Sequence, residues 1–172
     1  TADVARTLSR YLDGIVARTF LHSDIEDLAK YSSVPVINGL SDLFHPCQAL
    51  AVIFTVQENF GSMKGKVLAF VGDGNNVCHS LMMACAKVGI HVNVATPAGY
   101  APDARIVTLA QQFARESGSR IVVMRSPQDA VKGAQVIYAD VWVSMGQEAE
   151  TKKRLKIFQD YQINAKLCAL AD

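Results

Sequence analysis

Short runs of apolar, mostly β-branched residues alternate with longer segments of helical periodicity along the whole chain. A continuous apolar run such as Val67–Val71 is typical of a parallel strand that helices cover on both faces. Regular alternation of strands and helices predicts an α/β fold with a doubly wound parallel sheet. The expected strands are 14–19, 34–38, 66–72, 91–95, 120–124 and 136–140. The expected helices are 2–12, 23–31, 46–60, 76–88, 103–116, 127–132 and about 147–161.

The composition is that of an ordinary globular protein, and it excludes some functions. Of the 172 residues, 50% are hydrophobic and 19% are charged, which argues against wholesale disorder. Lys and Arg number 17 against 16 Asp and Glu, so the net charge of +1 offers no field to attract nucleic acid or an anionic membrane. No apolar run approaches the roughly 20 residues that span a bilayer. We therefore expect no nucleic-acid or membrane partner.

The cysteines carry no disulfide or metal signature. Cys47, Cys78, Cys85 and Cys168 have apolar neighbours and no Cys-x-x-Cys spacing. This pattern predicts buried free thiols in a reducing compartment. The four histidines do not cluster with them, so we expect no metal site.

One boundary divides the chain. The apolar helical segment 46–60 leads into a Gly-containing turn, after which a new strand–helix series begins. Residues 1–45 contain only two strands and two helices, too few for a core of their own. We therefore predict the tail of one α/β domain over 1–45, a linking helix over 46–61 and a second α/β domain over 62–172.

Polar clusters follow four of the predicted strands. Ligands of open parallel sheets bind beyond the carboxyl ends of the strands, so these clusters predict the position of a site. The clusters are Arg18-Thr19-Phe20, Phe44-His45-Pro46-Cys47-Gln48, Gly72-Asp73-Gly74-Asn75-Asn76 and Asp140-Val141-Trp142-Val143-Ser144-Met145-Gly146.

The glycine-containing cluster begins like a dinucleotide-binding loop. Val77, however, stands where the third glycine of that pattern belongs, and Thr96-Pro97 follow the next strand in place of the acid that holds a ribose hydroxyl. Free N–H groups at the helix start suit a carboxylate or a zwitterion better than a dinucleotide. Asn76 is therefore a candidate ligand-binding residue, and helix capping is the alternative, above all for Asn75.

His45, Gln48 and Arg18 are candidates for polarising a substrate. Pro46 suits the first turn of a helix, which allows His45 and Gln48 to point past the strand ends. A neutral imidazole and an amide can both donate to a carbonyl oxygen, and the guanidinium of Arg18 fits a phosphate or a carbonyl oxygen. The alternatives are a structural role for His45 and an ordinary surface ion pair for Arg18.

Asp140 ends a predicted apolar strand. A carboxylate there is unfavourable unless it is paired or meets a ligand ammonium group. Ser144, Met145 and Gly146 follow, and this sequence suggests backbone groups exposed close to a ligand. The alternative for Ser144 is capping of the following helix.

Together, these motifs resemble the aspartate/ornithine carbamoyltransferase family, and within it the enzymes that use ornithine. The resemblance covers essentially the whole chain, in order and at the spacing of the family. The matching motifs are Ala17-Arg18-Thr19-Phe20, Val34-Pro35-Val36-Ile37-Asn38-Gly39-Leu40-x-Asp42, Phe44-His45-Pro46-Cys47-Gln48, Val71-Gly72-Asp73-Gly74-Asn75-Asn76 and Asp140-x-Trp142-x-Ser144-Met145-Gly146-Gln147. Ser-Met-Gly separates the ornithine enzymes from their aspartate-using relatives.

The resemblance implies transfer of a carbamoyl group from carbamoyl phosphate to the δ-amine of L-ornithine, which gives L-citrulline and phosphate. It implies that Arg18, His45 and Gln48 bind carbamoyl phosphate. Arg18 and His45 would be the catalytic groups that stabilise negative charge on the carbonyl oxygen, and Gln48 would orient the carbamoyl nitrogen. Catalysis would then be positioning plus electrostatics, with no metal and no cofactor.

The same resemblance implies an ornithine site made by Asn76, Asp140, Ser144 and the backbone of Met145, with Asp140 facing the α-ammonium group. The part before the linking helix would be the C-terminal part of a carbamoyl-phosphate-binding domain. The part after it would be a Rossmann-like ornithine-binding domain that is incomplete at its C-terminus.

Two family motifs have no counterpart in this sequence, the Ser-x-Arg-Thr phosphate loop and the His-Cys-Leu-Pro segment. We therefore expect an interior fragment of the enzyme that does not catalyse by itself. For the whole enzyme, the resemblance implies a homotrimer and a role in arginine biosynthesis. Free thiols favour the cytoplasm, with a mitochondrial or plastid matrix as the alternative.

Three other functions remain open from the sequence. The first is a transcarbamoylase with a different amine acceptor, and the second is a dinucleotide-binding oxidoreductase domain. The third is a non-catalytic chain that keeps the fold for assembly or regulation.

Overall fold

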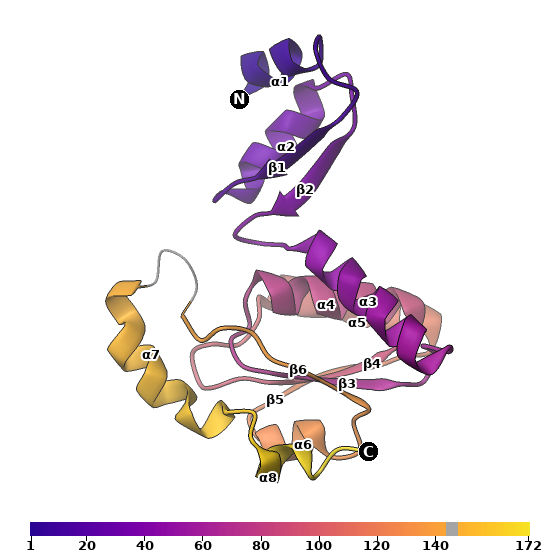
Figure 1. Ribbon diagram of the computed structural model, residues 1–172, viewed down its shortest axis with the longest axis vertical. Coiled ribbons are helices and arrows are strands. Elements are labelled where there is room, and N and C mark those ends of the chain that lie inside the picture. Colours follow the sequence, from indigo (N-terminus) through magenta and orange to yellow (C-terminus); the bar gives the residue numbers. More distant parts are fainter. Residues whose placement is uncertain (144–147) are drawn as a thin grey trace.

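The computed structural model describes residues 1–143 and 148–172, and it contains two parallel β-sheets. A smaller unit with a two-stranded sheet precedes helix α3 (Pro46–Phe60), and a larger unit with a four-stranded sheet follows it. Figure 1 shows the smaller unit above the larger one, with α3 between them. The predicted α/β class with parallel sheets is confirmed. Within the described ranges, no helix combines the length and the hydropathy needed to cross a membrane.

The smaller unit packs two helices against a pair of parallel strands. Its elements are α1 (Ala2–Leu8), β1 (Ile15–Arg18), α2 (His22–Tyr31) and β2 (Val36–Leu40). β1 pairs with β2 in parallel, and the register shifts between Ala17 and Arg18. Both strands run toward the larger unit (Figure 1), so their carboxyl ends lie at the junction of the two units.

Two predicted boundaries in the smaller unit are wrong for local reasons. The first helix ends at Leu8 instead of continuing to residue 12, because the Ser9 hydroxyl donates to the Ala5 carbonyl at 2.7 Å and accepts from the Ser33 N–H at 3.1 Å. Strand β2 starts at Val36 and not at residue 34. Pro35 has no N–H for a strand ladder, although its carbonyl accepts from Ile15 at 2.8 Å.

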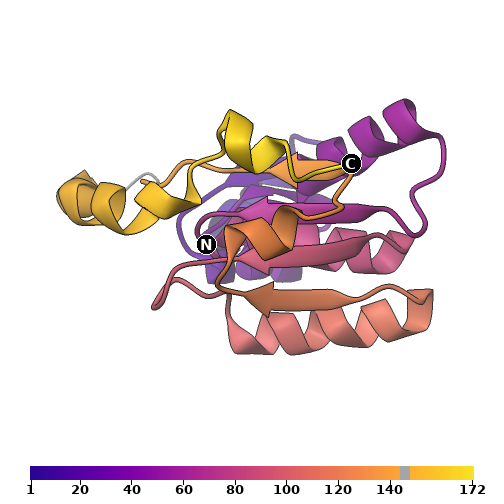
Figure 2. The same ribbon diagram turned by 90° about the horizontal axis from the view of Figure 1, so that it is seen from below.

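The larger unit is a four-stranded parallel sheet in the order β5-β4-β3-β6. Its elements are β3 (Val67–Val71), α4 (Asn76–Val88), β4 (His91–Ala95), α5 (Ala104–Ser117), β5 (Ile121–Met124), α6 (Pro127–Val131) and β6 (Val136–Tyr138). Helices α3, α4 and α5 cover one face of the sheet, and α6 and α8 lie on the other (Figures 1 and 2). This two-sided cover explains why the sequence of β3 is continuously apolar.

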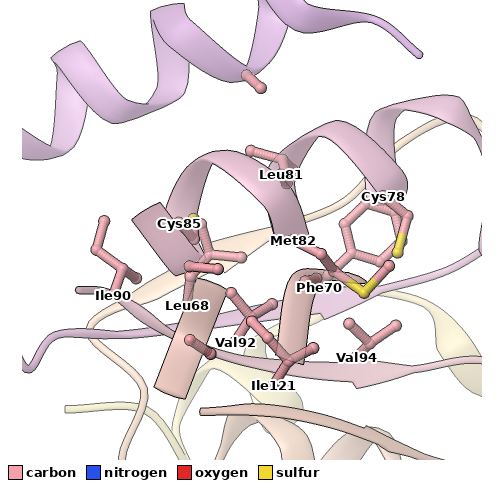
Figure 3. Packing of buried hydrophobic residues seen from close by; sticks show 14 of the residues in the cluster. Leu68, Phe70, Cys78, Leu81, Met82, Cys85, Ile90, Val92, Val94 and Ile121 are labelled. Atoms are coloured by element: carbon pink, nitrogen blue, oxygen red, sulfur yellow. The ribbon is translucent and has the colours of Figure 1, made fainter. Parts of the chain in front are cut away.

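The alternating faces of β3 divide the core into two layers. Leu68 and Phe70 are fully buried against α4, among residues that include Leu81 and Met82 (Figure 3). Ala69 and Val71 of the same strand pack in the opposite layer, with residues of α6 and of the C-terminal segment. Each fully buried Leu or Phe side chain contributes about 1.5–3 kcal/mol to folding, so the burial of Leu68 and Phe70 stabilises the unit.

The C-terminal segment differs from the single helix predicted over 147–161. It is divided into a 3₁₀ turn η1 (Glu148–Glu150), helix α7 (Thr151–Phe158) and a 3₁₀ turn η2 (Gln159–Tyr161). A short helix α8 (Ala165–Cys168), which we did not predict, follows and is capped by the Asn164 side chain. The tighter turn η2 brings both Phe158 and Tyr161 into the second core layer, and the Tyr161 hydroxyl donates to the Arg125 carbonyl at 2.6 Å.

The expectation of four buried thiols is wrong for two of them. Cys78 and Cys85 lie on the buried face of α4 and are inaccessible to solvent, but Cys47 and Cys168 are exposed. All four are free. The apolar sequence neighbours of Cys47 did not make it buried, because successive residues of a helix point in different directions.

Candidate functional site

The described residues of the four predicted polar clusters follow the carboxyl ends of β1, β2, β3 and β6. Residues 41–45 connect β2 to α3 across the junction of the two units, and α3 contacts both β2 and α4. The domain boundaries remain a prediction, since this helix is shared. The shared position nevertheless brings residues from both units to one place.

His45 is at the centre of this arrangement. It is the N-cap residue of α3, with Pro46 in the first turn as expected. Its backbone N–H donates to the Ser80 hydroxyl at 2.7 Å, and its Nδ1 atom is buried without a hydrogen-bond partner among the described residues. A buried ring nitrogen without a partner is uncommon in a folded protein and marks His45 as a residue that needs an explanation.

The charges of Arg18 and Asp140 both act on His45. Burial lowers the pKa of His45 below its usual 6.5, the Arg18 guanidinium lowers it further, and the Asp140 carboxylate opposes both. These effects keep the imidazole neutral at pH 7. Three predicted site residues from three different strand ends therefore share one electrostatic environment.

Arg18 is exposed at the end of β1. It forms no ion pair with any carboxylate of residues 1–143 or 148–172, so the alternative of an ordinary surface ion pair is wrong within those ranges. A guanidinium without an internal partner keeps its full capacity for a bidentate bond to a phosphate or carboxylate.

Gln48 is one helical turn after His45 and lies near Tyr138, the last residue of β6, whose pKa it lowers. Burial raises the pKa of Tyr138, which keeps its hydroxyl protonated. The Tyr138 ring stacks on Phe70, with centroids 5.9 Å apart and planes 16° apart, so a core aromatic fixes the direction of the hydroxyl.

The two asparagines after β3 have different roles. Asn75 caps α4, because its side-chain oxygen accepts from the backbone N–H groups of Val77 and Cys78, both at 3.1 Å. The capping alternative for Asn75 is thus confirmed. Asn76 donates from its side-chain amide to the Ser41 carbonyl at 2.6 Å, and its own oxygen accepts from Val77 at 2.9 Å.

Asp140 lies two residues beyond the end of β6, and not at the end of the strand as predicted. The sheet pairing of β6 with β3 includes Tyr138 but no later residue, so the carboxylate is outside the ladder. Its Oδ2 accepts from the Asn75 amide at 2.7 Å and its Oδ1 accepts from the Val141 N–H at 2.8 Å. The cap of α4 therefore orients this half-buried acid.

Asp73 is the acid of the same loop, and it pairs with Arg154 of α7. The two side chains are nearly buried, and Arg154 also donates to the Trp142 carbonyl and lies over the ring of Tyr100, 4.9 Å from its centroid. Burial raises the pKa of Asp73, and the bond to Arg154 opposes that shift. This pair attaches α7 to the glycine loop, and the sequence interpretation missed it.

Two predicted ornithine-binding residues, Ser144 and Met145, lie outside the described residues. The alternative cap role of Ser144 lies there too. No group of three or more His, Cys, Asp or Glu side chains within the described ranges could hold a metal ion.

Sequence reasoning also missed His79, Ser80 and Tyr138 as supports of the site. For the first two, a signal existed in the spacing Asn76-x-x-His79-Ser80, which puts three polar side chains on one face of an otherwise apolar helix. Tyr138 carried no such signal, because an aromatic residue in a strand is most often core.

A separate surface cavity of about 580 Å³ lies between α6, η2 and α8, where it is lined by residues such as Arg125, Tyr161 and Asn164. It includes none of the predicted site residues. At the junction, by contrast, a free guanidinium and a neutral imidazole can stabilise an oxyanion, and a carboxylate can accept an ammonium group.

Comparison with known proteins matches both units to one family. Residues 64–172 match the model of the Asp/Orn binding domain of aspartate/ornithine carbamoyltransferase. Residues 1–58 match the model of the carbamoyl-P binding domain of the same family.

Curated relatives and solved structures agree with this match. The chain is 58% identical over 166 residues to an ornithine carbamoyltransferase from Pyrococcus horikoshii, covering 96% of the chain and 52% of that protein. It is 57% identical over 166 residues to one from Pyrococcus furiosus named anabolic, covering 96% of the chain and 53% of the relative. A solved ornithine carbamoyltransferase from P. furiosus superposes with a TM-score of 0.95 at 56% identity, covering 99% of the chain and 55% of that structure. The chain thus spans about half the length of the curated relatives that it matches.

Proposed function

Because the chain belongs to the aspartate/ornithine carbamoyltransferase family, we propose that it serves the transfer of a carbamoyl group from carbamoyl phosphate to L-ornithine. The δ-amine nitrogen attacks the carbonyl carbon, the bond from that carbon to the phosphate oxygen breaks, and the phosphate leaves with the electron pair. The attacking nitrogen loses one proton, which the leaving phosphate takes up, and the products are L-citrulline and phosphate. The observation that carries this proposal is the joint action of Arg18 and Asp140 on His45.

The carbamoyl-phosphate half of the proposed site combines one cationic side chain, Arg18, with two neutral side chains, His45 and Gln48. The Arg18 guanidinium binds a phosphate or carbonyl oxygen, and the neutral His45 imidazole donates to the carbonyl oxygen as it gains negative charge. Gln48, which lies near Tyr138, has an amide oxygen that can accept from the carbamoyl NH₂ group. These groups polarise and position the substrate, and none of them becomes covalently bonded to it.

The ornithine half of the proposed site is built around Asp140. Its carboxylate accepts the α-ammonium group, and the Asn75 bond holds it in one orientation. Asn76, at the first turn of α4, is proposed to bind the amino-acid end of the substrate with Ser144 and Met145. We propose that the δ-amine then points toward His45, whose pKa the Asp140 carboxylate raises.

The proposal for the whole enzyme includes three further properties, which are its metabolic role, its oligomeric state and its location. A role in arginine biosynthesis is supported by the anabolic name of the P. furiosus relative. A homotrimer and a cytoplasmic location are further proposals that rest on the family resemblance and on the free thiols. The oxidoreductase alternative is not favoured, since both family models and all the relatives described above are carbamoyltransferases.

A chemical-shift titration tests the proposal on the chain itself. L-Ornithine should shift the amide resonances of Asn76, Asp140 and their neighbours, and carbamoyl phosphate should shift those around Arg18 and His45. Shifts by NADH confined to residues 72–76, with no response to ornithine, would instead favour a dinucleotide-binding domain. A lack of response to every ligand would contradict binding by this chain.

Matched arginine variants distinguish specific binding from general charge. Arg18→Ala should weaken carbamoyl-phosphate binding about tenfold or more, since a charge-assisted hydrogen bond contributes about 1.5–3 kcal/mol. Arg115→Ala removes another exposed arginine, in the last turn of α5, and should leave binding unchanged. Equal losses in both variants would indicate non-specific attraction of the anion.

A further inference from the structure

Helix α4 holds the connecting segment 41–45 by three hydrogen bonds to its main chain. The Asn76 amide donates to the Ser41 carbonyl at 2.6 Å, the His79 Nδ1 atom lies 3.0 Å from the Leu43 carbonyl, and the His45 N–H donates to the Ser80 hydroxyl at 2.7 Å. Positions 76, 79 and 80 are spaced i, i+3 and i+4, so the three side chains share one helix face. We call this group, Asn76, His79 and Ser80, the α4 clamp. One of its three hydrogen bonds is to the backbone of His45, the residue with the proposed catalytic imidazole.

His79 connects the clamp to a third segment. The Asp103 N–H donates to its Nε2 atom at 3.0 Å, which requires that this nitrogen has no proton. The proton of the neutral ring is then on Nδ1, where it is donated to the Leu43 carbonyl. Only this tautomer satisfies both bonds, and it ties the connecting segment to the start of α5.

The groups around His79 shift its pKa in opposite directions. Burial lowers its pKa below 6.5, while the bond to the Leu43 carbonyl and the carboxylates of Asp103 and Asp73 oppose this. Arg105 pairs with Asp103 at 2.7 Å, and Arg154 pairs with Asp73, so both carboxylates are already compensated. The ring of Phe44 packs edge-on against the imidazole, with centroids 6.2 Å apart. The neutral ring is therefore the stable form at pH 7.

Protonation of His79 would break its hydrogen bond with the Asp103 N–H as well as add a positive charge. A proton on Nε2 would face the Asp103 N–H, and two donors cannot share a hydrogen bond. Because His79 is only 6% exposed, water could not easily replace the lost acceptor. The ring would have to move, and the Leu43 carbonyl would lose its donor.

We propose that His79 is a positioning residue for His45: its neutral Nδ1–H tautomer fixes the connecting segment, and its protonation releases that segment and displaces His45. The consequence for catalysis rests on the proposed function, in which His45 polarises the carbonyl oxygen. The clamp itself is a property of the fold and can be tested without any substrate.

A pH titration of the free chain by nuclear magnetic resonance tests the clamp. Long-range proton–nitrogen spectra at pH 7.5 should identify the Nδ1–H tautomer of His79. As the pH falls, the His79 ring should titrate below 6.5, and the amide resonances of Leu43 and Phe44 should shift with the same midpoint. The Nε2–H tautomer, or Leu43 and Phe44 amides that do not follow the His79 ring, would overturn the proposal.

Two variants separate the clamp from general effects of burial. His79→Phe keeps a ring but removes both hydrogen bonds, so the shared titration of the Leu43 and Phe44 amides should vanish. His91→Phe is the control, because His91 is also a ring that accepts a backbone N–H, from Arg120 at 3.1 Å, but it lies in β4 away from the segment. That control should leave the titration unchanged. If His79→Phe does not fold, the wild-type titration alone decides.

Binding of carbamoyl phosphate then connects the clamp to the proposed function. In the wild-type chain, the dissociation constant should rise at least threefold when the pH falls through the His79 midpoint, and His79→Phe should bind weakly at every pH. A confirmed clamp with no binding of carbamoyl phosphate at any pH would contradict the proposed function and leave the clamp standing. Normal binding by His79→Phe, with an unchanged pH profile, would instead refute the positioning role.

Discussion

The side-chain amide of Asn75 donates a 2.7 Å hydrogen bond to the carboxylate of Asp140, although the two residues are 65 positions apart. The oxygen of the same amide caps helix α4. One side chain therefore joins the start of a core helix to the acid that we propose for ammonium recognition. Substitution of this residue should affect both stability and binding.

We expect Asn75→Ala to lower the free energy of unfolding by about 1–2 kcal/mol, as typical for a lost N-cap, and also to weaken ornithine binding. Urea unfolding and an ornithine titration measure the two effects. Ser126→Ala is the matched control, because Ser126 caps α6 by accepting from the Asp129 N–H at 3.1 Å but lies away from the site. It should reduce stability without an effect on binding. Intact ornithine binding by Asn75→Ala would contradict the orienting role.

Loss of the buried ion pair between Arg154 and Asp73 should lower the free energy of unfolding. Arg154→Met leaves the Asp73 carboxylate, whose side chain is only 11% exposed, without its partner, so stability at pH 7 should fall by about 3–5 kcal/mol. The loss should shrink in acid, because a buried carboxyl with a raised pKa becomes neutral as the pH falls. Adding Asp73→Asn to Arg154→Met should restore part of the stability. A double variant less stable than Arg154→Met would show that the charge of Asp73 is not the cause.

Gly74 is required by close packing. A Cβ atom there would lie 2.2 Å from the Pro102 nitrogen and 2.5 Å from the Ala101 carbonyl carbon, and backbone atoms cannot move aside cheaply. Gly74→Ala should therefore destabilise the chain by roughly 1–3 kcal/mol or more. Gly14→Ala is the control, since its nearest neighbour would be 3.7 Å away and its φ is not positive. Thermal unfolding compares the two, and equal melting temperatures would contradict the packing argument.

Stability should decrease as the pH falls through the range in which free histidine titrates. The pKa values of His45, His79 and His91 are all lowered from 6.5, chiefly by burial. Below about 7 the unfolded chain then binds more protons than the folded chain, so the free energy of unfolding falls until the folded-state pKa values are reached. Urea midpoints measured from pH 8 to pH 5.5 check the sign. His79→Gln should flatten the dependence, and an unchanged slope would show that His79 does not contribute.

The cysteines should fall into two classes of reactivity. Burial raises the pKa of Cys85 to about 12 and that of Cys78 further still, so neither thiol forms a reactive thiolate near neutral pH. A thiol-specific reagent should modify the exposed Cys47 and Cys168 quickly in the native chain, and all four cysteines in urea. Fast native modification of Cys78 or Cys85 would mean that α4 opens readily from the sheet.

Signals that act within a few residues could be predicted from the sequence. The apolar run of β3 and its helical flanks predicted the parallel sheet, and Pro46 and Asn75 marked the starts of α3 and α4, where both helices begin. The four polar clusters at strand ends also supplied the candidate site residues, because parallel strands present their carboxyl ends along one edge. Caps, turns and periodicity are local, so the amino-acid sequence by itself determined the elements and the candidate residues.

Partnerships across the fold were decided only by the tertiary structure. His79 meets the Leu43 carbonyl 36 positions away, and Arg154 meets Asp73 81 positions away. No local pattern encodes such a pair, because it depends on how helices pack on the sheet and which polar groups burial leaves in need of a partner. The same packing divided the predicted last helix and moved Asp140 beyond its strand. Sequence thus determined which residues could form the site, and burial decided which neighbours hold them there.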